Sequence, residues 1–135
     1  MRKVLSAMLA VLFLVILAMP AFAAEAENKV VAPRYTYIHI LSSDLSINES
    51  TGIASCKASC YAASGHTVEI VCRLQKYTGS TWSMLKTWST SGFEYASINE
   101  NWAVYSGYDY RLYIMYNVRN AEGNLVETTT RYDYC

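Results

Sequence analysis

One stretch of the chain decides the fold class: Tyr108-Asp109-Tyr110-Arg111-Leu112-Tyr113-Ile114-Met115-Tyr116-Asn117-Val118. Tyr110, Leu112 and Ile114 recur at every second position, and the polar residues Arg111 and Asn117 stand on the opposite side. A period of two places successive side chains on opposite faces of an extended chain. The pattern therefore predicts a β-strand with one buried and one solvent-exposed face.

The same period continues outside this stretch. Val68, Ile70 and Cys72 alternate with Glu69 and Arg73, and clusters of Gly, Ser, Asn and Asp separate the patterned segments. The expected strands are 34–41, 44–48, 53–61, 67–77, 82–90, 95–105 and 108–118, with 125–134 as a candidate eighth. Because no helical period accompanies them, we expect an all-β domain over residues 34–135, built as an antiparallel two-sheet sandwich.

The N-terminal residues have the features of a signal peptide. Met1-Arg2-Lys3 is positively charged, residues 4–19 are almost entirely apolar, and Ala21-Phe22-Ala23 fits a signal-peptidase site. We expect residues 1–23 to be removed after Ala23, residues 24–33 to form a flexible lead-in, and the remaining domain to be secreted into the extracellular space.

The charge of the remaining chain excludes one class of partner. Removal of Arg2 and Lys3 leaves nine of the eleven basic residues against eleven acidic ones, so no basic footprint for nucleic acid is present. No further apolar stretch reaches the roughly 18 residues of a membrane helix. We therefore expect neither nucleic acid nor, after cleavage, a membrane as a partner.

Four cysteines, Cys56, Cys60, Cys72 and Cys135, remain after cleavage. An even number in a short exported chain is typical of a disulfide framework. Zinc is the competing interpretation, but the spacing lacks paired Cys-x2-Cys knuckles. We therefore expect no metal and no other cofactor.

A hairpin between strands 53–61 and 67–77 would place Cys56 opposite Cys72, close enough for a bridge. The same positions also suit two small core residues. The expected pairs are Cys56 with Cys72 and Cys60 with Cys135, the second securing the end of the chain.

Residues 106–112, Ser-Gly-Tyr-Asp-Tyr-Arg-Leu, resemble the tyrosine corner of immunoglobulin-like sandwiches. In that motif a tyrosine hydroxyl bonds to the backbone a few residues upstream. The resemblance implies this structural role for Tyr110. It departs from the antibody pattern at Leu112, which stands where the inter-sheet cysteine would be.

A candidate binding surface surrounds the loop Thr78–Thr81. If these four residues join a hairpin, Tyr77 faces Trp82, Arg73 faces Lys86 and Val71 faces Trp88. Two tryptophans about 20 Å apart would suit an extended ligand such as a glycan. A bulge that turns Trp82, Leu85 and Trp88 inward would remove this surface. The predicted ligand-binding residues are Tyr77, Trp82, Trp88, Arg73 and Lys86.

The sequence offers no catalytic constellation. His39 lies in an apolar run without a neighbouring acid, His66 lacks the second histidine of a zinc-protease motif, and no Gly-x-Ser-x-Gly elbow is present. The scattered carboxylates show no glycosidase pairing. We therefore expect no catalytic residues and no enzyme activity.

At larger scale the chain resembles a family of small exported Firmicutes proteins without an assigned function. The resemblance rests on three segments of the sequence. These are Leu74-Gln75-Lys76-Tyr77 with Gly79 and Trp82, Lys86-Thr87-Trp88-Ser89, and Ser106-Gly107-Tyr108 with Tyr110-Arg111. It implies export and a compact β domain, and it carries no site residues.

The expected function is a secreted, non-catalytic binding or surface-interaction module whose partner is an extracellular glycan, cell-wall material or a protein. One alternative is a small secreted structural or envelope-stress protein without a ligand, in which all aromatics serve the core. A third is a small secreted hydrolase with a dispersed site.

Overall fold

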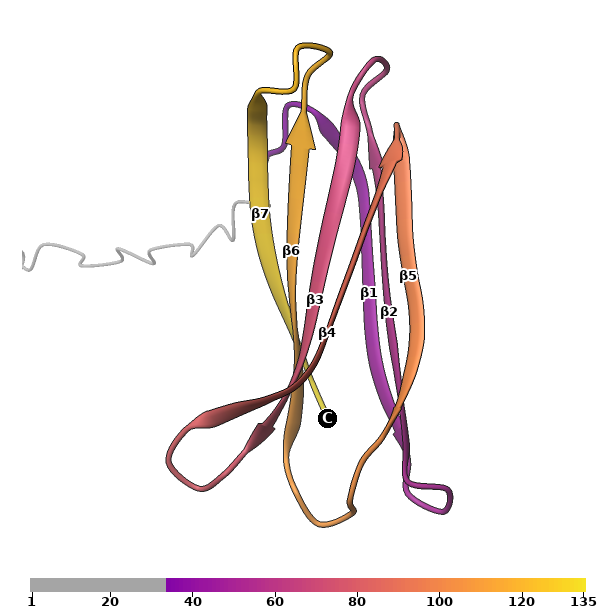
Figure 1. Ribbon diagram of the computed structural model, residues 1–135, viewed down its shortest axis with the longest axis vertical. Coiled ribbons are helices and arrows are strands. Elements are labelled where there is room, and N and C mark those ends of the chain that lie inside the picture. The colour runs from indigo at the N-terminus through magenta and orange to yellow at the C-terminus, as the bar shows by residue number, and fades with distance from the viewer. Residues whose placement is uncertain (1–33) are drawn as a thin grey trace, which may run out of the picture. The chain divides into compact units, whose positions relative to one another are not determined.

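The computed structural model describes residues 34–135, which form seven strands (Figure 1). The predicted signal peptide at 1–23 and lead-in at 24–33 lie outside the described residues. Within the described part, no helical segment with the length and hydropathy of a membrane span is present. The strands are β1 (Ile38–Asn48), β2 (Ile53–Ala62), β3 (Thr67–Tyr77), β4 (Trp82–Phe93), β5 (Tyr95–Ala103), β6 (Tyr110–Arg119) and β7 (Leu125–Tyr134).

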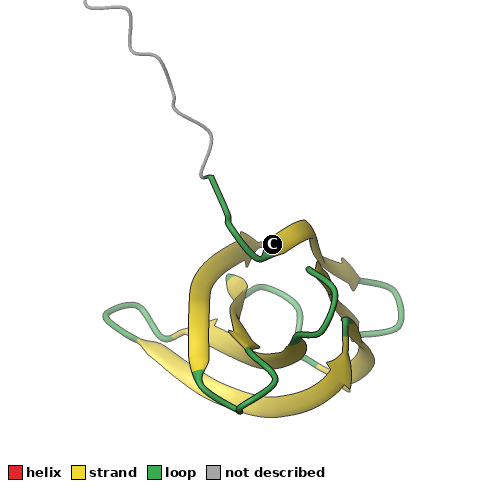
Figure 2. Ribbon diagram, turned by 90° about the horizontal axis from the view of Figure 1, so that it is seen from above, coloured by secondary structure: helices red, strands yellow, loops and turns green. Residues whose placement is uncertain are grey.

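The strands form two antiparallel sheets that face each other. One sheet has the order β1-β2-β5 and the other β4-β3-β6-β7; they stand on opposite sides of the molecule in Figure 1, and Figure 2 views them along the strands. This arrangement, with β1, β2 and β5 facing β3, β6 and β7, is that of immunoglobulin-like sandwiches. Here β4 is added to the second sheet beside β3. The predicted fold class is confirmed.

The core lies between the sheets and combines small and large side chains. Strand β2 contributes only small buried residues, while the facing strands β3 and β6 contribute aliphatic and aromatic ones. The large side chains of one sheet therefore occupy the space left by the small side chains of the other. The buried hydroxyl of Tyr116 donates to the carbonyl of Ser42, 2.9 Å away, which satisfies its hydrogen-bonding capacity. The buried side chains on these three strands are Ala54, Cys56, Ala58, Cys60, Ala62, Val68, Ile70, Cys72, Leu74, Tyr110, Leu112, Ile114, Tyr116 and Val118.

The first strand corrects the sequence prediction. Residues 34–41 and 44–48 were expected as separate strands with a turn at Ser42-Ser43-Asp44, but β1 is continuous from Ile38 to Asn48. These three residues pair directly with residues 59, 58 and 57 of β2. Serine and aspartate are accommodated because alternate residues of this edge strand face solvent. The candidate strand at 125–134 is present as β7.

Tyr110 makes the contact expected of a tyrosine corner. Its side chain is buried at the start of β6, and its hydroxyl donates to the carbonyl of Tyr105, 2.5 Å away and five residues upstream. The backbone of Tyr110 also exchanges two hydrogen bonds with Cys135. This residue therefore joins the loop before β6, the strand itself and the end of the chain.

The predicted bridges are not formed, since all four cysteines carry free thiols. Strands β2 and β3 do not pair with each other: β2 lies between β1 and β5, and β3 lies between β4 and β6. The hairpin that would have placed Cys56 opposite Cys72 is therefore wrong. Both side chains instead point into the core from different sheets, as two small buried residues.

The second predicted bridge fails on distance. Cys60 is buried near Glu127, close to the start of β7, whereas Cys135 follows the end of that strand and is exposed. Eight residues of extended chain separate the two positions by about 26 Å, far beyond the reach of a disulfide. Cys60 and Cys135 therefore belong to opposite ends of the sandwich.

The carboxylate of Glu127 closes the seam between β7 and the segment that leads into β1. Its Oε1 accepts a hydrogen bond from the backbone of Thr36 at 2.7 Å, and its Oε2 accepts bonds from the backbones of Tyr37 and Ile38, each at 2.8 Å. Hydrogen bonds to a charged acceptor are stronger than neutral ones. Residues 36–38 are thus attached to the second sheet before they join the first.

Candidate functional site

The outer face of the four-stranded sheet gathers aromatic side chains and arginines. Strand pairing places Gln75 beside Arg111 and Arg111 beside Tyr134, and it places Arg73 beside Tyr113 and Tyr113 beside Tyr132. Residues directly opposite in an antiparallel sheet share a face. Their neighbours on the inner side of β6 are core residues, so these side chains face outward.

Five rings on this face form a continuous chain of contacts. Trp82 lies 5.2 Å from Tyr77 and 6.0 Å from Tyr134, measured between ring centroids. Tyr132 in turn lies 6.3 Å from Tyr134 and 5.1 Å from Tyr113. We call this surface the aromatic–arginine face and define it by Arg73, Tyr77, Trp82, Arg111, Tyr113, Tyr132 and Tyr134.

Both arginines lie against these rings. The guanidinium carbon of Arg111 is 4.3 Å from the centroid of Trp82 and 4.8 Å from that of Tyr132, and that of Arg73 is 5.7 Å from Tyr113. The Nε of Arg111 donates to Oε1 of Gln75 at 2.7 Å. Cation–π contact favours these positions and restricts the motion of the charged groups.

The rings remain accessible to solvent despite their mutual packing. Tyr134 is 63% exposed, Tyr132 45% and Tyr77 36%, while Trp82 and Tyr113 are half-buried. The face extends about 13 Å along the strands and about 14 Å across them, from the spacings of an ordinary sheet. An accessible apolar surface of this kind, bordered by fixed charges, is typical of a contact site.

Three of the five predicted binding residues, Tyr77, Trp82 and Arg73, lie on this face, but Trp88 and Lys86 do not. The predicted pairing of Tyr77 with Trp82 is present, and Gln75 pairs with Met84. An irregularity between Leu74 and Gln75 then shifts the register, so that Arg73 pairs with Thr87 instead of Lys86, and Trp88 pairs with Cys72.

The shift turns Trp88 inward. This side chain packs against the core and lies 6.3 Å from Trp102 of β5, and the ammonium of Lys86 lies 5.0 Å above the same Trp102 ring. Leu85, the extra residue of the bulge, also packs against the core. Trp88 and Lys86 therefore lie where the edge strands β4 and β5 meet. The prediction of a binding surface that includes both tryptophans is wrong.

Four residues of the face, Arg111, Tyr113, Tyr132 and Tyr134, were not among the predicted site residues. The signal for them was present in the turn Glu122-Gly123-Asn124 between two strand patterns. That turn indicates a second hairpin, in which Arg111 pairs with Tyr134 and Tyr113 with Tyr132, but the pairing also depends on a register shift between Val118 and Arg119. The turn residues do not reveal this shift, so the pairing of these four residues could not be obtained from the turn alone.

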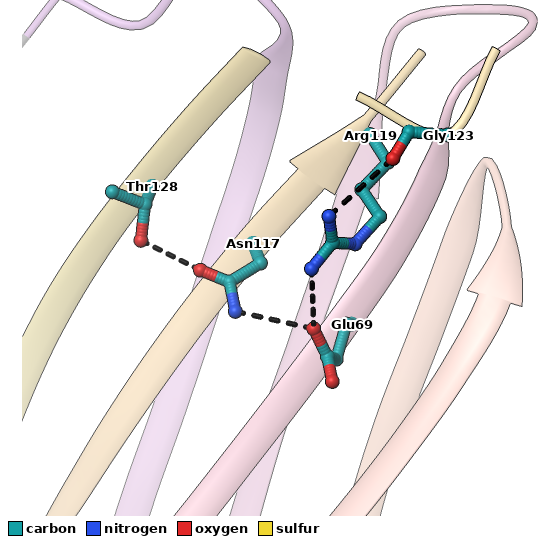
Figure 3. Close-up of polar contacts among 5 residues, drawn as sticks. All are labelled: Glu69, Asn117, Arg119, Gly123 and Thr128. Atoms are coloured by element: carbon teal, nitrogen blue, oxygen red, sulfur yellow. Dashed lines mark hydrogen bonds and ion pairs between the residues drawn. The ribbon is translucent and has the colours of Figure 1, made fainter. Parts of the chain in front are cut away.

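The other end of the same sheet face is polar and electrically balanced (Figure 3). Glu69 Oε2 accepts a hydrogen bond from Asn117 at 3.2 Å and lies 3.8 Å from a terminal nitrogen of Arg119. Thr128 donates to Asn117 Oδ1 at 2.7 Å, and Arg119 also reaches the carbonyl of Gly123 at 3.4 Å. Charge on this end is neutralised within the protein, in contrast to the aromatic–arginine face.

An open depression of about 350 Å³ lies on the outer face of the three-stranded sheet. Serines 42, 59 and 97 form its floor because they occupy one row across β1, β2 and β5. Its lining holds one charged side chain, Lys57, and one ring, Tyr95. The depression offers fewer recognition groups than the aromatic–arginine face.

Ser64, His66 and Glu94 lie close together, but they do not form a nucleophile–base pair. The ring of His66 contacts the carbonyl of Ser64 at 2.9 Å, while the hydroxyl of Ser64 donates to Glu94 at 2.8 Å. The histidine therefore does not reach the hydroxyl, as a general base would have to. No cluster of three or more His, Cys, Asp or Glu with metal-binding geometry occurs within residues 34–135.

Comparisons with known proteins add no family to this description. No protein-family model matches the chain, and a search of curated proteins gives no significant match. The geometry of the aromatic–arginine face therefore carries the functional argument.

Proposed function

We propose that the chain is an exported, non-catalytic binding module that uses the aromatic–arginine face to contact glycans or cell-wall material. The connected, solvent-accessible set of five rings carries this proposal. Flat apolar rings suit the apolar faces of sugar rings, and neighbouring donors suit their hydroxyl groups. The signal-peptide features of residues 1–23 and the resemblance to small exported Firmicutes proteins support an extracellular location.

A rigid sheet strengthens the proposal. All seven residues of the face stand on or at the ends of paired strands, not on a mobile loop. Because contacts with neighbouring rings already restrict the side chains, binding orders few new groups and loses little conformational entropy. Such preorganisation is what a binding site needs when its ligand is extended and flexible.

The mutual packing of the rings favours one alternative, a structural protein without a ligand. Contacts such as Tyr77 with Trp82 stabilise adjacent strands whether or not a ligand is present. The two functions differ in the consequence of removing one exposed ring. Loss of a stabilising ring lowers the free energy of unfolding, whereas loss of a contact ring lowers affinity.

A screen against cell-wall preparations and soluble glycans tests the proposal. Trp82→Ala and Tyr134→Ala should each lower the affinity for a retained glycan by about tenfold or more. Tyr61→Ala is the matched control, because Tyr61 is 47% exposed and contacts the ring of Tyr95 on the three-stranded sheet, away from the aromatic–arginine face. Retention of none of the glycans, or equal losses for Tyr61→Ala, would contradict the proposed function.

A further inference from the structure

The arginines of the aromatic–arginine face have no negative partner in the described chain. The single ion pair within residues 34–135 joins Arg119 to Glu69, at the polar end of the sheet. Arg111 bonds to the neutral amide of Gln75 instead. Asp109, two residues before Arg111 in the chain, forms no ion pair, and even with its charge counted the face keeps an excess of positive charge. Such a surface attracts anionic ligands.

The stacking contacts leave the binding edges of Arg111 free. Its guanidinium lies near the rings of both Trp82 and Tyr132, and its Nε–H is occupied by Gln75. The two terminal NH2 groups have no acceptor among residues 34–135. A planar fork of N–H groups matches the oxygens of a carboxylate or phosphate, and charge-assisted bonds of this kind are stronger than neutral ones.

The second arginine of the face, Arg73, lies close to Arg111 in the sheet. Arg73 lies beside Tyr113, and Tyr113 is two residues from Arg111 on the neighbouring strand. Diagonal neighbours in an antiparallel sheet are roughly 7–8 Å apart. Two arginines anchored on neighbouring strands at this backbone separation, each against a ring, suit a polymer that carries repeated anionic groups along a chain of apolar-faced units.

Resting on the function proposed above, we propose that the aromatic–arginine face selects acidic glycans, and that Arg73 and Arg111 bind the carboxylate or phosphate groups of the polymer. The rings then contact the sugar or polyol units, and the arginines distinguish charged chains from neutral ones. Nucleic acid is a less suitable anion, because residues 24–135 carry more acidic than basic groups and lack a basic stripe.

Matched polymers of different charge test this inference. Polygalacturonate supplies carboxylates, its fully methyl-esterified form supplies the same backbone without charge, and poly(glycerol phosphate) supplies phosphates. We expect the purified protein to bind at least one anionic polymer about tenfold or more tightly than the esterified one at low salt, with the difference decreasing as salt is added. The two anionic polymers distinguish carboxylate from phosphate as the recognised group.

Charge-removing variants assign the effect to the arginines. Arg111→Gln and Arg73→Gln should each weaken binding of the anionic polymer by about 10- to 100-fold, with little effect on residual binding of the esterified polymer. Arg111→Lys keeps the charge but loses the planar fork, so it should recover only part of the affinity. Arg119→Gln is the control, since its charge is already paired with Glu69.

Each contrary outcome has a distinct meaning. Equal binding of charged and esterified polymers, unchanged by the arginine variants, would overturn this inference and leave the proposed function in place. Equal losses for Arg119→Gln and Arg111→Gln would also overturn it, because the effect would then follow net charge alone. Failure of every charged and neutral polymer to bind would overturn both.

Discussion

Tyr110 and Glu94 each hold a loop of the sandwich in place through a single side chain. Tyr110 fastens the loop before β6 through its hydroxyl and the carbonyl of Tyr105. Glu94, between β4 and β5, has a φ of 61°, the only positive φ of a residue other than glycine in the described chain. Both are structural residues, and each gives a specific expectation for stability.

We expect Tyr110→Phe to lower the free energy of unfolding by about 1–3 kcal/mol, because the Tyr105 carbonyl loses its donor while ring packing is retained. Tyr108→Phe is the control, since the Tyr108 side chain is 51% exposed. Urea denaturation of both variants measures the effect. An unchanged midpoint for Tyr110→Phe would show that the hydrogen bond does not contribute to stability.

We expect Glu94→Gln to alter the dependence of stability on pH. Hydrogen bonds from the backbone of Gly65 and the hydroxyl of Ser64, each at 2.8 Å, together with the charge of His66, lower the pKa of Glu94. A carboxyl whose pKa is lower in the folded state stabilises the protein above its unfolded pKa, and this contribution is lost as the pH falls through the folded value.

The wild type should therefore be more stable than Glu94→Gln at neutral pH, and the difference should shrink as the pH falls below the ordinary glutamate value of about 4.5. Urea midpoints measured from pH 7 downward check this expectation. Glu122→Gln, in the exposed turn before β7, serves as the control. A constant difference at all pH values would mean that the Glu94 charge is not responsible.

At the level of elements, the bulge in β4 decides which tryptophan joins the outer face of the sheet and which one packs against the core. The register is regular from Tyr77 to Gln75 and shifts by one residue beyond it. A one-residue shift moves every following side chain to the other face. Trp82, before the shift, joins the aromatic–arginine face, and Trp88, after it, packs against the core.

Substitution of the two tryptophans should separate these roles. Trp88→Ala leaves a gap beside Trp102 and should cost about 2 kcal/mol, below the range for fully buried aromatics because Trp88 is only partly buried. Trp82→Ala should cost about 1 kcal/mol or less. Thermal and urea denaturation compare them. A larger loss of stability for Trp82→Ala would place that residue in the structural role.

The strands themselves could be predicted from sequence because alternation in β3 and β6 reports directly which face is buried. The assignment of these strands to one sheet or the other could not be predicted from sequence. Residues 63–66 make a connection short enough for a hairpin, yet it crosses from one sheet to the other, and Glu94 bonds to its backbone from a distant part of the chain. The bulge at Leu85 was equally hidden, since it depends on the packing of Trp88 against β5.

For the whole molecule, burial determines the chemistry of the cysteines. Burial raises the pKa of Cys56 and of Cys72 to about 12 and that of Cys60 to about 11. Neighbouring ionisable groups raise the pKa further: Glu127 acts on Cys60, and Cys56 and then Asp133 act on Cys72. The thiolate is the reactive form. These three thiols are therefore unreactive for two reasons: they are buried, and they remain protonated at neutral pH.

We expect iodoacetamide at about pH 8 to modify only Cys135 in the folded protein and all four cysteines after denaturation without reductant. A reducing agent should leave the denaturation midpoint unchanged, in contrast to a domain held by bridges. Mass spectrometry of the alkylated protein provides the measurement. Fewer than four modified thiols in the denatured, unreduced protein would demonstrate a disulfide.

The attachment of residues 36–38 to Glu127 has a mechanical consequence. It holds the beginning of the described chain beside the start of β7, whereas Cys135 lies beyond the other end of that strand. Tension applied between these points therefore acts along the strands. Because the hydrogen bonds of an antiparallel sheet run perpendicular to the strands, such tension shears many bonds together instead of opening them one at a time. A domain stretched in this direction between two anchoring points would resist extension well.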